Sequence, residues 1–276
     1  MLELAYMSIE GMTEQDRESL YSCVAAERRE QLMARKNRLS ADLSLAGEVL
    51  ARWMLWKAVM QLEEERQAQC DCIPDDFPYS KGIPGVIKPK DFVILRDADG
   101  KPYQETVPGL FFNYSHSGTM VACGIAGENI GVDIQKRTEG GRVREKVYCQ
   151  EEWNEENGSD DSMHFFTEVW AKKESYLKLT GEGLRKDMTS LHLRKMQEEG
   201  AVQWYGGWVT EAYCLYACIE GSQEKTVLCN FTRNKTGEFN GLNRNDEKGD
   251  RKYDTGSMYQ IRLSEVIDLL KSIQET

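Results

Sequence analysis

The sequence predicts an α+β fold built from two parts. Helical patterns and short apolar segments with strand-like alternation occur on both sides of residue 107. All six prolines fall between residues 74 and 108, and proline removes a backbone donor and fixes φ. This window is therefore expected to be a loop-rich connection that holds one short strand at "DFVIL" (91–95).

The first part is expected to begin with a strand and to continue with two helices. Arg28, Arg35 and Arg38 recur at helical spacing within residues 26–39 and form a basic stripe, a pattern that is most often simply solvated. The next helix covers residues 40–62, with Ser40 as its N-cap. Its apolar residues lie on nearly every side, which is typical of a helix packed on both sides.

The second part is expected to alternate strands and helices. "EVLAR" (48–52) and "EVWAK" (168–172) resemble each other. An internal duplication of the two parts is therefore conceivable, although five residues are weak evidence for it. The expected elements are strands at 111–126 and 129–135, a polar helical connection, a helix at 162–179, and strands around 189–194 and 212–219.

The composition after about residue 231 changes to asparagine, glycine and charged residues, which predicts a flexible link. A strand-like alternation around Tyr259 and a short helix capped by Ser264 follow, and this end is expected to dock back on the body. The predicted domains are therefore 1–107, 108–230 and 231–276.

The net charge of -11 argues against a general nucleic-acid binder, because phosphate neutralisation needs a basic surface. The chain shows no basic leader and no run of 18 apolar residues, which indicates a soluble cytoplasmic protein without membrane contact. The eight cysteines form no paired CxxC units and favour free thiols over disulfides or zinc. Cys70 and Cys72 flank one aspartate, a weaker indication of a metal.

Three segments contain polar groups in apolar surroundings. "FFNYSHSG" (111–118) interrupts an apolar strand with hydrogen-bonding side chains. In "NIGVDIQKR" (129–137), alternation puts Gly131, Asp133 and Gln135 on the face opposite the aliphatic residues. A buried aspartate is costly unless its charge is paired. A strand-end aspartate bonded to backbone amides is the alternative.

The helix at 162–179 places Glu174 on or beside its buried face, between Trp170 and Leu177, with Lys178 one turn later. The alternative is an exposed pair of Glu174 and Lys178, which contributes only about 0.3 to 0.5 kcal/mol. Two carboxylates, a lysine, a histidine and serines together suit a magnesium pyrophosphate site, because Mg²⁺ takes oxygen ligands from carboxylates and substrate phosphates.

Five motifs occur in an order and at spacings that resemble the Sfp-type 4′-phosphopantetheinyl transferases. The resemblance runs from about residue 27 to 220. The motifs are the basic helix Arg28 to Arg38, "GKPY" (100–103), "FNYSHSG" (112–118), "GVDIQ" (131–135) and "WAKKESYLKLTGEGL" (170–184).

The resemblance implies a monomeric enzyme with two similar α+β halves, related by a pseudo-twofold axis, and coenzyme A in the cleft between them. Such enzymes transfer the 4′-phosphopantetheine arm of coenzyme A to a serine of an apo carrier protein of acyl, peptidyl or polyketide type. The products are the holo-carrier and 3′,5′-ADP, in fatty acid or secondary metabolite biosynthesis. Mg²⁺ is the implied cofactor.

The resemblance also implies roles for single residues. Asp133 and Glu174 would hold Mg²⁺, Lys178 would offset phosphate charge, and Glu174 would accept the proton of the carrier serine. Gln135 replaces the second acid of the family's "DIE" pattern, and its oxygen can bind Mg²⁺ or a water but adds no charge. The coenzyme A contacts are implied for Arg28, Arg35, Arg38, Ser44, Lys101, Pro102, Ser115, His116 and Lys173.

Two other functions remain open from the sequence. A non-catalytic regulator that binds coenzyme A or a nucleotide would account for Gln135 and for the C-terminal tail that the motifs do not cover. A Mg²⁺-dependent pyrophosphate hydrolase would use the same cations and would release ADP without a carrier.

Overall fold

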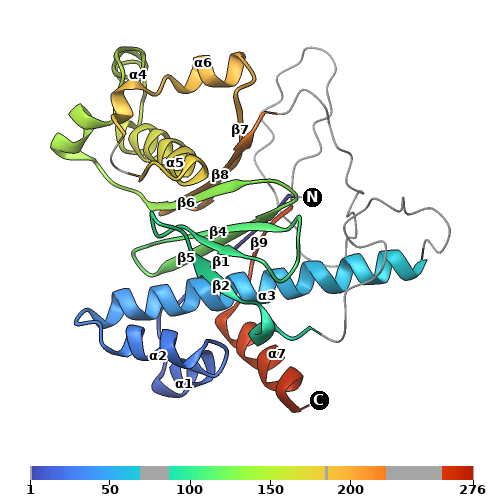
Figure 1. Cartoon of the computed structure of the whole chain (residues 1–276). Coiled ribbons are helices and arrows are strands. Elements are labelled where there is room, and N and C mark those ends of the chain that lie inside the picture. Colours follow the sequence, from blue (N-terminus) through green and yellow to red (C-terminus); the bar gives the residue numbers. More distant parts are fainter. Residues whose placement is uncertain (1, 69–86, 184–185, 222–256, 276) are drawn as a thin grey trace.

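The computed structural model describes residues 2–68, 87–183, 186–221 and 257–275. Two β-sheets lie in the middle of the molecule, and one long helix covers the outer face of each (Figure 1). The helix of the first sheet is α3 (Arg38–Ala68), and the helix of the second is α5 (Ser162–Thr180). The α+β class predicted from the sequence is confirmed.

The first sheet has four strands in the order β4-β5-β1-β9. β1 pairs antiparallel with β5 and parallel with β9, so the C-terminal segment docks on the N-terminal strand as expected. The strands are β1 (Leu2–Ser8), β4 (Phe111–Ser117), β5 (Met120–Ala126) and β9 (Ser257–Gln260).

The second sheet has three antiparallel strands in the order β6-β8-β7. The alternation predicted for the β6 segment is confirmed, because Ile130, Val132 and Ile134 join a cluster between the two sheets. Asp133 therefore lies on the opposite face, which α5 covers. The strands are β6 (Ile130–Lys136), β7 (Val202–Thr210) and β8 (Tyr213–Glu220).

The helices pack closely on their sheets at positions where glycine, which has no side chain, lies in the contact. A Cβ on Gly131 of β6 would lie 2.0 Å from the carbonyl oxygen of Ser175 in α5. A Cβ on Gly47 of α3 would lie 2.7 Å from the ring of Tyr114 in β4. Glycine at residue 131 thus allows the backbone of α5 to approach the strand that carries Asp133.

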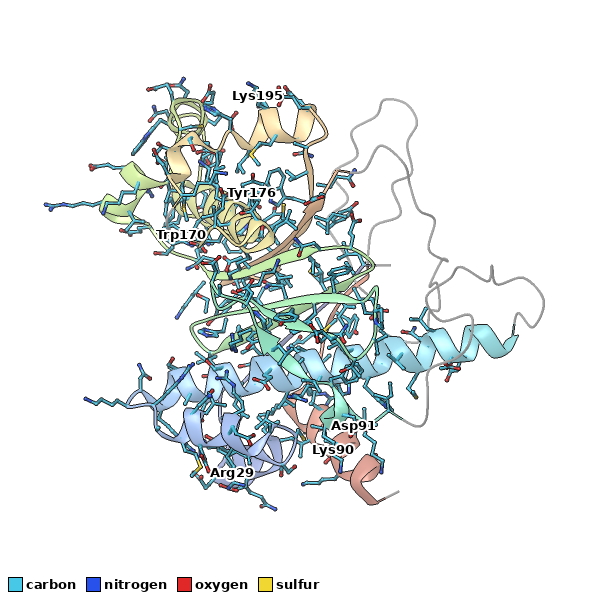
Figure 2. The ribbon with its side chains drawn as sticks, viewed as in Figure 1. Arg29, Lys90, Asp91, Trp170, Tyr176 and Lys195 are labelled. Atoms are coloured by element: carbon cyan, nitrogen blue, oxygen red, sulfur yellow. The ribbon has the colours of Figure 1, made fainter. Side chains whose placement is uncertain are left out.

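Short elements complete the two parts, and Figure 2 shows the side chains between them, with Trp170 and Tyr176 on α5 and Lys195 on α6. β2 and β3 pair antiparallel beside the first sheet. These elements are α1 (Glu14–Tyr21), α2 (Ala26–Met33), η1 (Pro89–Asp91), β2 (Ile94–Arg96), β3 (Pro102–Gln104), η2 (Gly141–Lys146), α4 (Gln150–Glu156), η4 (Met188–Ser190), α6 (Leu193–Glu198) and α7 (Leu263–Glu275).

Three expectations differ from the structure. The segment 189–194 forms no strand, because Asp187 caps η4 and His192 begins α6, while β7 was not predicted. The α3 helix begins at Arg38, and the Asn37 side chain accepts the amide hydrogen of Ser40 (3.0 Å), so Ser40 is not the N-cap. The single strand expected at 111–126 is a hairpin, which turns at Gly118 with φ of 58°.

The four-stranded sheet contains strands from both sides of residue 107, since β4 and β5 pair with β1. The proline window therefore does not mark where the two sheets divide; the chain passes to the second sheet between β5 and β6. The domains 1–107, 108–230 and 231–276 stay a prediction. The flexible link expected from residue 231 and the pair Cys70 and Cys72 lie outside the described residues.

The cysteines that the structure describes are all buried and free, as the sequence predicted: Cys23, Cys123, Cys149, Cys214 and Cys218. Among the helices of the described ranges, none combines the length and the apolar character that a membrane span requires.

Candidate functional site

Polar side chains of β4 join the two sheets at their adjoining edges. The amide of Val132 in β6 donates to Asn113 Oδ1 (3.0 Å), and the amide of Lys136 donates to Ser117 Oγ (3.0 Å). Between them, Ser115 Oγ donates to Asp133 Oδ1 (2.8 Å). The polar residues that interrupt this apolar strand therefore satisfy donors and acceptors of the neighbouring sheet.

Asp133 is buried and only partly satisfied. Its Oδ1 accepts hydrogen bonds from Ser115 and from the Lys178 ammonium (2.6 Å). Its Oδ2 is buried without a hydrogen-bond partner. Because a buried, unpartnered carboxylate oxygen is costly, this atom indicates a place for a cation or a donor supplied by a ligand.

Glu174 lies on α5, one turn before Lys178, and faces the same site. Burial and then the negative charge of Asp133 raise the pKa of Glu174 to about 7, while Lys178 acts in the opposite direction. The two carboxylates are therefore close enough to interact. The structure thus brings Ser115, Asp133, Glu174 and Lys178 together, as the sequence predicted.

Gln135 lies two residues after Asp133 on the same face of β6. Its side chain is half-buried, and its Nε2 donates to the carbonyl of Lys136 (3.1 Å). This bond holds the amide nitrogen and leaves the amide oxygen to accept a donor or to bind a cation.

His116 lies near two cationic side chains, those of Lys178 and Arg35. The residue is exposed, yet desolvation of the ring, followed by the charges of Lys178 and Arg35, lowers the pKa of His116. Arg35 donates through Nη1 to Ser44 Oγ (2.7 Å). The lowered pKa favours the neutral imidazole, which can donate one N–H to an anion while Lys178 and Arg35 supply the positive charge.

Arg28 reaches from α2 to α3. Its Nε donates to Glu48 Oε2 (2.8 Å), and its Nη2 is buried without a partner. Glu48 also accepts from Arg52 Nη2 (3.1 Å) and so orients both arginines. Glu48 was not among the residues predicted from the sequence, although its i,i+4 spacing to Arg52 in "EVLAR" was a local signal.

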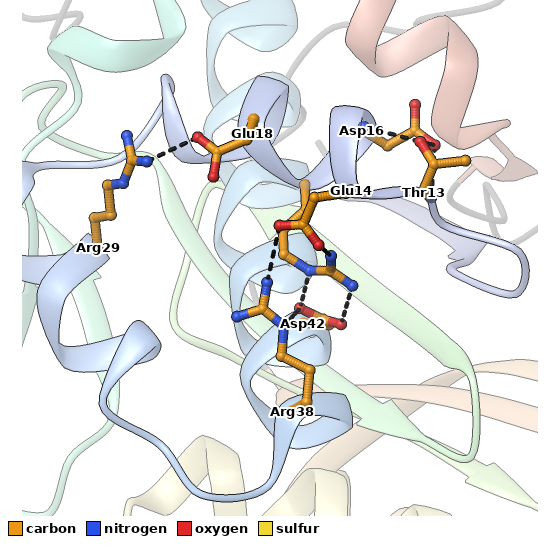
Figure 3. Close-up of polar contacts among 8 residues, drawn as sticks. Thr13, Glu14, Asp16, Glu18, Arg29, Arg38 and Asp42 are labelled. Carbon is orange, nitrogen blue, oxygen red and sulfur yellow. Dashed lines mark hydrogen bonds and ion pairs between the residues drawn. The ribbon is translucent and has the colours of Figure 1, made fainter.

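Arg38 belongs to a separate cluster of charges (Figure 3). Its guanidinium lies 3.5 Å from Asp42 and 3.6 Å from Glu14. Arg17 binds the same two carboxylates. These two carboxylates balance the positive charge of Arg38, which links α1 to α3. Arg38 is therefore not brought to Asp133 in this structure.

Lys173 also lies away from the residues around Asp133. Its side chain is 0% exposed, and its ammonium binds Glu152 Oε2 (2.6 Å) and the carbonyl oxygens of Val147 (2.6 Å) and Met188 (3.0 Å). All three N–H donors are thus used within the protein. The expected contact of Lys173 with coenzyme A finds no support in this placement.

Lys101 contacts the C-terminal end of α5, and Pro102 follows it in the chain. The Lys101 ammonium donates to the carbonyl of Leu179 (3.0 Å) and to Asn129 Oδ1 (2.8 Å), and desolvation lowers the pKa of Lys101. Pro102 is buried at the start of β3. The "GKP" turn is therefore attached to the helix that carries Glu174 and Lys178.

Comparison with known proteins agrees with this arrangement. A family model described as the 4′-phosphopantetheinyl transferase superfamily matches residues 129–227, which contain Asp133, Glu174 and Lys178. A 4′-phosphopantetheinyl transferase of Bacillus subtilis is 31% identical over 106 residues, which are 37% of this chain and 47% of the relative.

Two further relatives match over a longer range. The 4′-phosphopantetheinyl transferase Sfp of Bacillus subtilis (strain 168) is 25% identical over 190 residues, 68% of this chain and 73% of the relative. The 4′-phosphopantetheinyl transferase ffp of Bacillus subtilis is 26% identical over 194 residues, 69% of this chain and 75% of the relative. The ordered motifs, the α+β fold and these matches together make the chain similar to the 4′-phosphopantetheinyl transferase superfamily.

Proposed function

We propose that this chain transfers the 4′-phosphopantetheine arm of coenzyme A to a serine of an apo carrier protein and releases 3′,5′-ADP. The observation that carries the proposal is the group of Asp133, Glu174 and Lys178 beside Ser115, where a buried carboxylate oxygen has no partner. The relatives named above support the reaction class. The carrier is of the acyl, peptidyl or polyketide type.

Magnesium fits the residues at this site. Asp133 Oδ2 is an unpartnered oxygen, and the charge of Asp133 raises the pKa of Glu174, so a divalent cation between them would relieve both costs. Asp133 and Glu174 would be its ligands, and the Gln135 oxygen would be a third or would hold a bound water. When bound, Mg²⁺ would neutralise charge on the pyrophosphate.

Positive charge and neutral donors around this centre suit the phosphates of coenzyme A. Arg28 offers a buried Nη2 that has no partner within the described part of the protein. With Arg35, Ser44 and His116 it forms the set that we propose for the 3′-phosphate. Ser115 and Lys178 are proposed for the pyrophosphate, and Lys101 with Pro102 for the adenine.

In the proposed reaction the hydroxyl oxygen of the carrier serine attacks the β-phosphorus of the pyrophosphate. A new P–O bond forms to the serine, and the bond between that phosphorus and the bridging oxygen breaks. The bridging oxygen leaves with 3′,5′-ADP, and Lys178 offsets its negative charge. The serine proton passes to the Glu174 carboxylate, directly or through a water.

The test is mass spectrometry of an apo carrier after incubation with the protein, coenzyme A and Mg²⁺. We expect a mass gain of one phosphopantetheine group, with 3′,5′-ADP in equal amount. Asp133→Asn removes the charge that faces both Glu174 and the metal, so we expect transfer to fall by about 10³-fold, typical for loss of one electrostatic contact in a transition state.

The matched control is Glu198→Gln, which neutralises an exposed carboxylate on α6 and should leave the rate unchanged. Coenzyme A binding without transfer to any of several carriers, measured by titration calorimetry, would favour a binding protein and contradict the proposal. ADP released in the absence of a carrier would instead indicate a hydrolase.

A further inference from the structure

A second group of metal-ligand side chains lies apart from the site at Asp133. Cys149 precedes α4, Glu151 lies in the first turn of α4, and His192 precedes α6. The ligand atoms of these three residues all lie within 4.8 Å of one another. The His192 Nδ1 and Glu151 Oε2 atoms are 3.1 Å apart. We propose that these three side chains bind Zn²⁺, independently of the transferase reaction.

The donor types favour zinc. A cysteine sulfur, an imidazole nitrogen and a carboxylate oxygen are the three kinds of protein ligand that Zn²⁺ accepts, and three of them with a water complete a tetrahedral site. With metal–ligand distances of about 2.0 to 2.3 Å, neighbouring ligand atoms in a tetrahedron lie about 3.3 to 3.6 Å apart. The His192–Glu151 separation of 3.1 Å is close to this range, and the separations up to 4.8 Å need the side chains to move inward by about an ångström. Mg²⁺, which prefers oxygen alone, is disfavoured here.

The backbone around the three ligands is held by buried contacts. Glu152 Oε2 accepts the amide hydrogen of Cys149 (2.9 Å) and binds the ammonium of Lys173. The same ammonium binds the carbonyl oxygens of Val147 and Met188, which lie within four residues of Cys149 and of His192. One buried lysine thus fixes both segments that supply ligands, so the three donors meet on a constrained framework.

A simpler interpretation is an exposed ion pair between His192 and Glu151, whose side chains are 44% and 64% exposed. Such pairs contribute little to stability on their own. The thiol of Cys149, a buried residue, also donates a hydrogen bond to the Glu151 carboxylate, so its sulfur adds a third ligand atom within reach of both groups. The sulfur is the observation that favours a metal over a surface ion pair.

Cobalt substitution tests the site without an activity measurement. Co²⁺ is titrated into the full chain without oxygen, in a Cys70→Ser/Cys72→Ser background that removes the other closely spaced thiols. We expect one equivalent to produce a sulfur-to-cobalt charge-transfer band and the intense visible bands of a tetrahedral complex. Zinc should displace it. Cobalt bound only by oxygens of Asp133 and Glu174 would give no charge-transfer band.

The variants separate a built site from accidental binding. Cys149→Ser should abolish the charge-transfer band, and Glu151→Gln and His192→Ala should each weaken cobalt binding at least tenfold. The matched controls are Cys23→Ser, Glu155→Gln and His164→Ala, which change the same residue types elsewhere and should have no effect. Since Glu151 and His192 are exposed, circular dichroism should show an intact fold. The absence of a charge-transfer band, or a band that persists in Cys149→Ser, would overturn the proposed zinc site. Neither result would contradict the proposed transferase activity.

Discussion

Two lysines of α5, Lys173 and Lys178, each bind a buried carboxylate, but their surroundings differ. Lys173 is 0% exposed and binds Glu152 and two backbone carbonyl oxygens. Lys178 is 28% exposed and binds Asp133 and the Ser115 hydroxyl. The first ammonium has all of its donors occupied within the protein, whereas the second keeps one that can reach a ligand.

The unpartnered oxygens of the two acids do not by themselves distinguish the pairs. Both Asp133 Oδ2 and Glu152 Oε1 are buried without a hydrogen-bond partner. The difference is that Asp133 acts on a second carboxylate, Glu174, whose pKa it raises. A functional interpretation therefore rests on three features together. They are the unpartnered oxygen of Asp133, the raised pKa of the neighbouring Glu174 and the solvent-accessible ammonium of Lys178.

The largest expected effect comes from breaking the buried pair. Lys173→Met leaves the Glu152 charge without its partner, which should lower the free energy of unfolding by about 3 to 5 kcal/mol, measured by urea denaturation. Lys178→Met also leaves a buried acid, Asp133, without its cation, but solvent reaches this site, so we expect a smaller loss of about 1 to 3 kcal/mol in stability. Phosphopantetheinyl transfer by this variant should nevertheless fall by at least tenfold.

The double variant Lys173→Met/Glu152→Met is the control for the first change. It removes both charges and should regain most of the lost stability, since apolar replacement of a whole buried pair is often neutral. An equal loss of unfolding free energy in Lys173→Met and Lys178→Met would show that the two pairs contribute equally to stability, which would contradict the distinction between them.

The sequence indicated that Lys178 lies near Glu174, but it gave no sign that Lys173 is enclosed by other contacts, and the reason is physical. Glu174 and Lys178 lie one turn apart and share a helix face, so the position of one indicates that of the other. Lys173 precedes Glu174 by one residue and points about 100° away around the helix. Its partner Glu152 lies 21 residues earlier, in a segment without strong periodicity. Only the folded chain shows that the two meet.

The second expected effect tests the distance between α5 and β6. Gly131→Ala places a Cβ where Ser175 O would lie 2.0 Å away and Leu179 N 2.3 Å away, so α5 must shift. Overpacking of this kind costs about 1 to 3 kcal/mol. The shift separates Glu174 and Lys178 from Asp133, and transfer should fall more steeply than stability. The measurements are the transfer rate and the unfolding free energy of one preparation.

Gly158→Ala is the matched control, because its Cβ would lie 3.6 Å from the nearest described atom, an ordinary contact. It should leave both quantities nearly unchanged. A Gly131→Ala variant with full transfer activity would mean that the site tolerates displacement of α5, contrary to the proposed mechanism.

The same packing explains which strands the sequence could predict. β6 alternates aliphatic residues with small or polar ones, so both its existence and its two faces were predicted. β7 contains Gly206 and Gly207, which weaken the strand signal. A Cβ on Gly206 would lie 2.0 Å from the carbonyl oxygen of Leu215, so glycine there allows β7 to approach β8. The need for glycine at residue 206 comes from the contact between β7 and β8, so the sequence around residue 206 does not reveal it.

The smallest expected effect is the pH dependence of stability that Glu174 causes. Its pKa is about 7 in the folded chain against 4.5 in the unfolded reference, so the folded state holds the proton more tightly between these values. Stability therefore falls as pH rises from about 4.5 to 7, because ionised Glu174 is costly in its largely desolvated position and beside Asp133. Glu174→Gln stays neutral and avoids this cost.

We expect Glu174→Gln to match the wild type in stability below pH 4.5. Above pH 7 it should be more stable by about 1 to 2 kcal/mol, less than the full pKa difference implies because the side chain is part-exposed and screened. Thermal unfolding across this pH range measures the difference, which Mg²⁺ should reduce by stabilising ionised Glu174 in the wild type. A stability difference that does not change with pH would mean that Glu174 is not held near Asp133. The Lys178–Asp133 pair would then have no second carboxylate beside it, and this distinction from the Lys173–Glu152 pair would disappear.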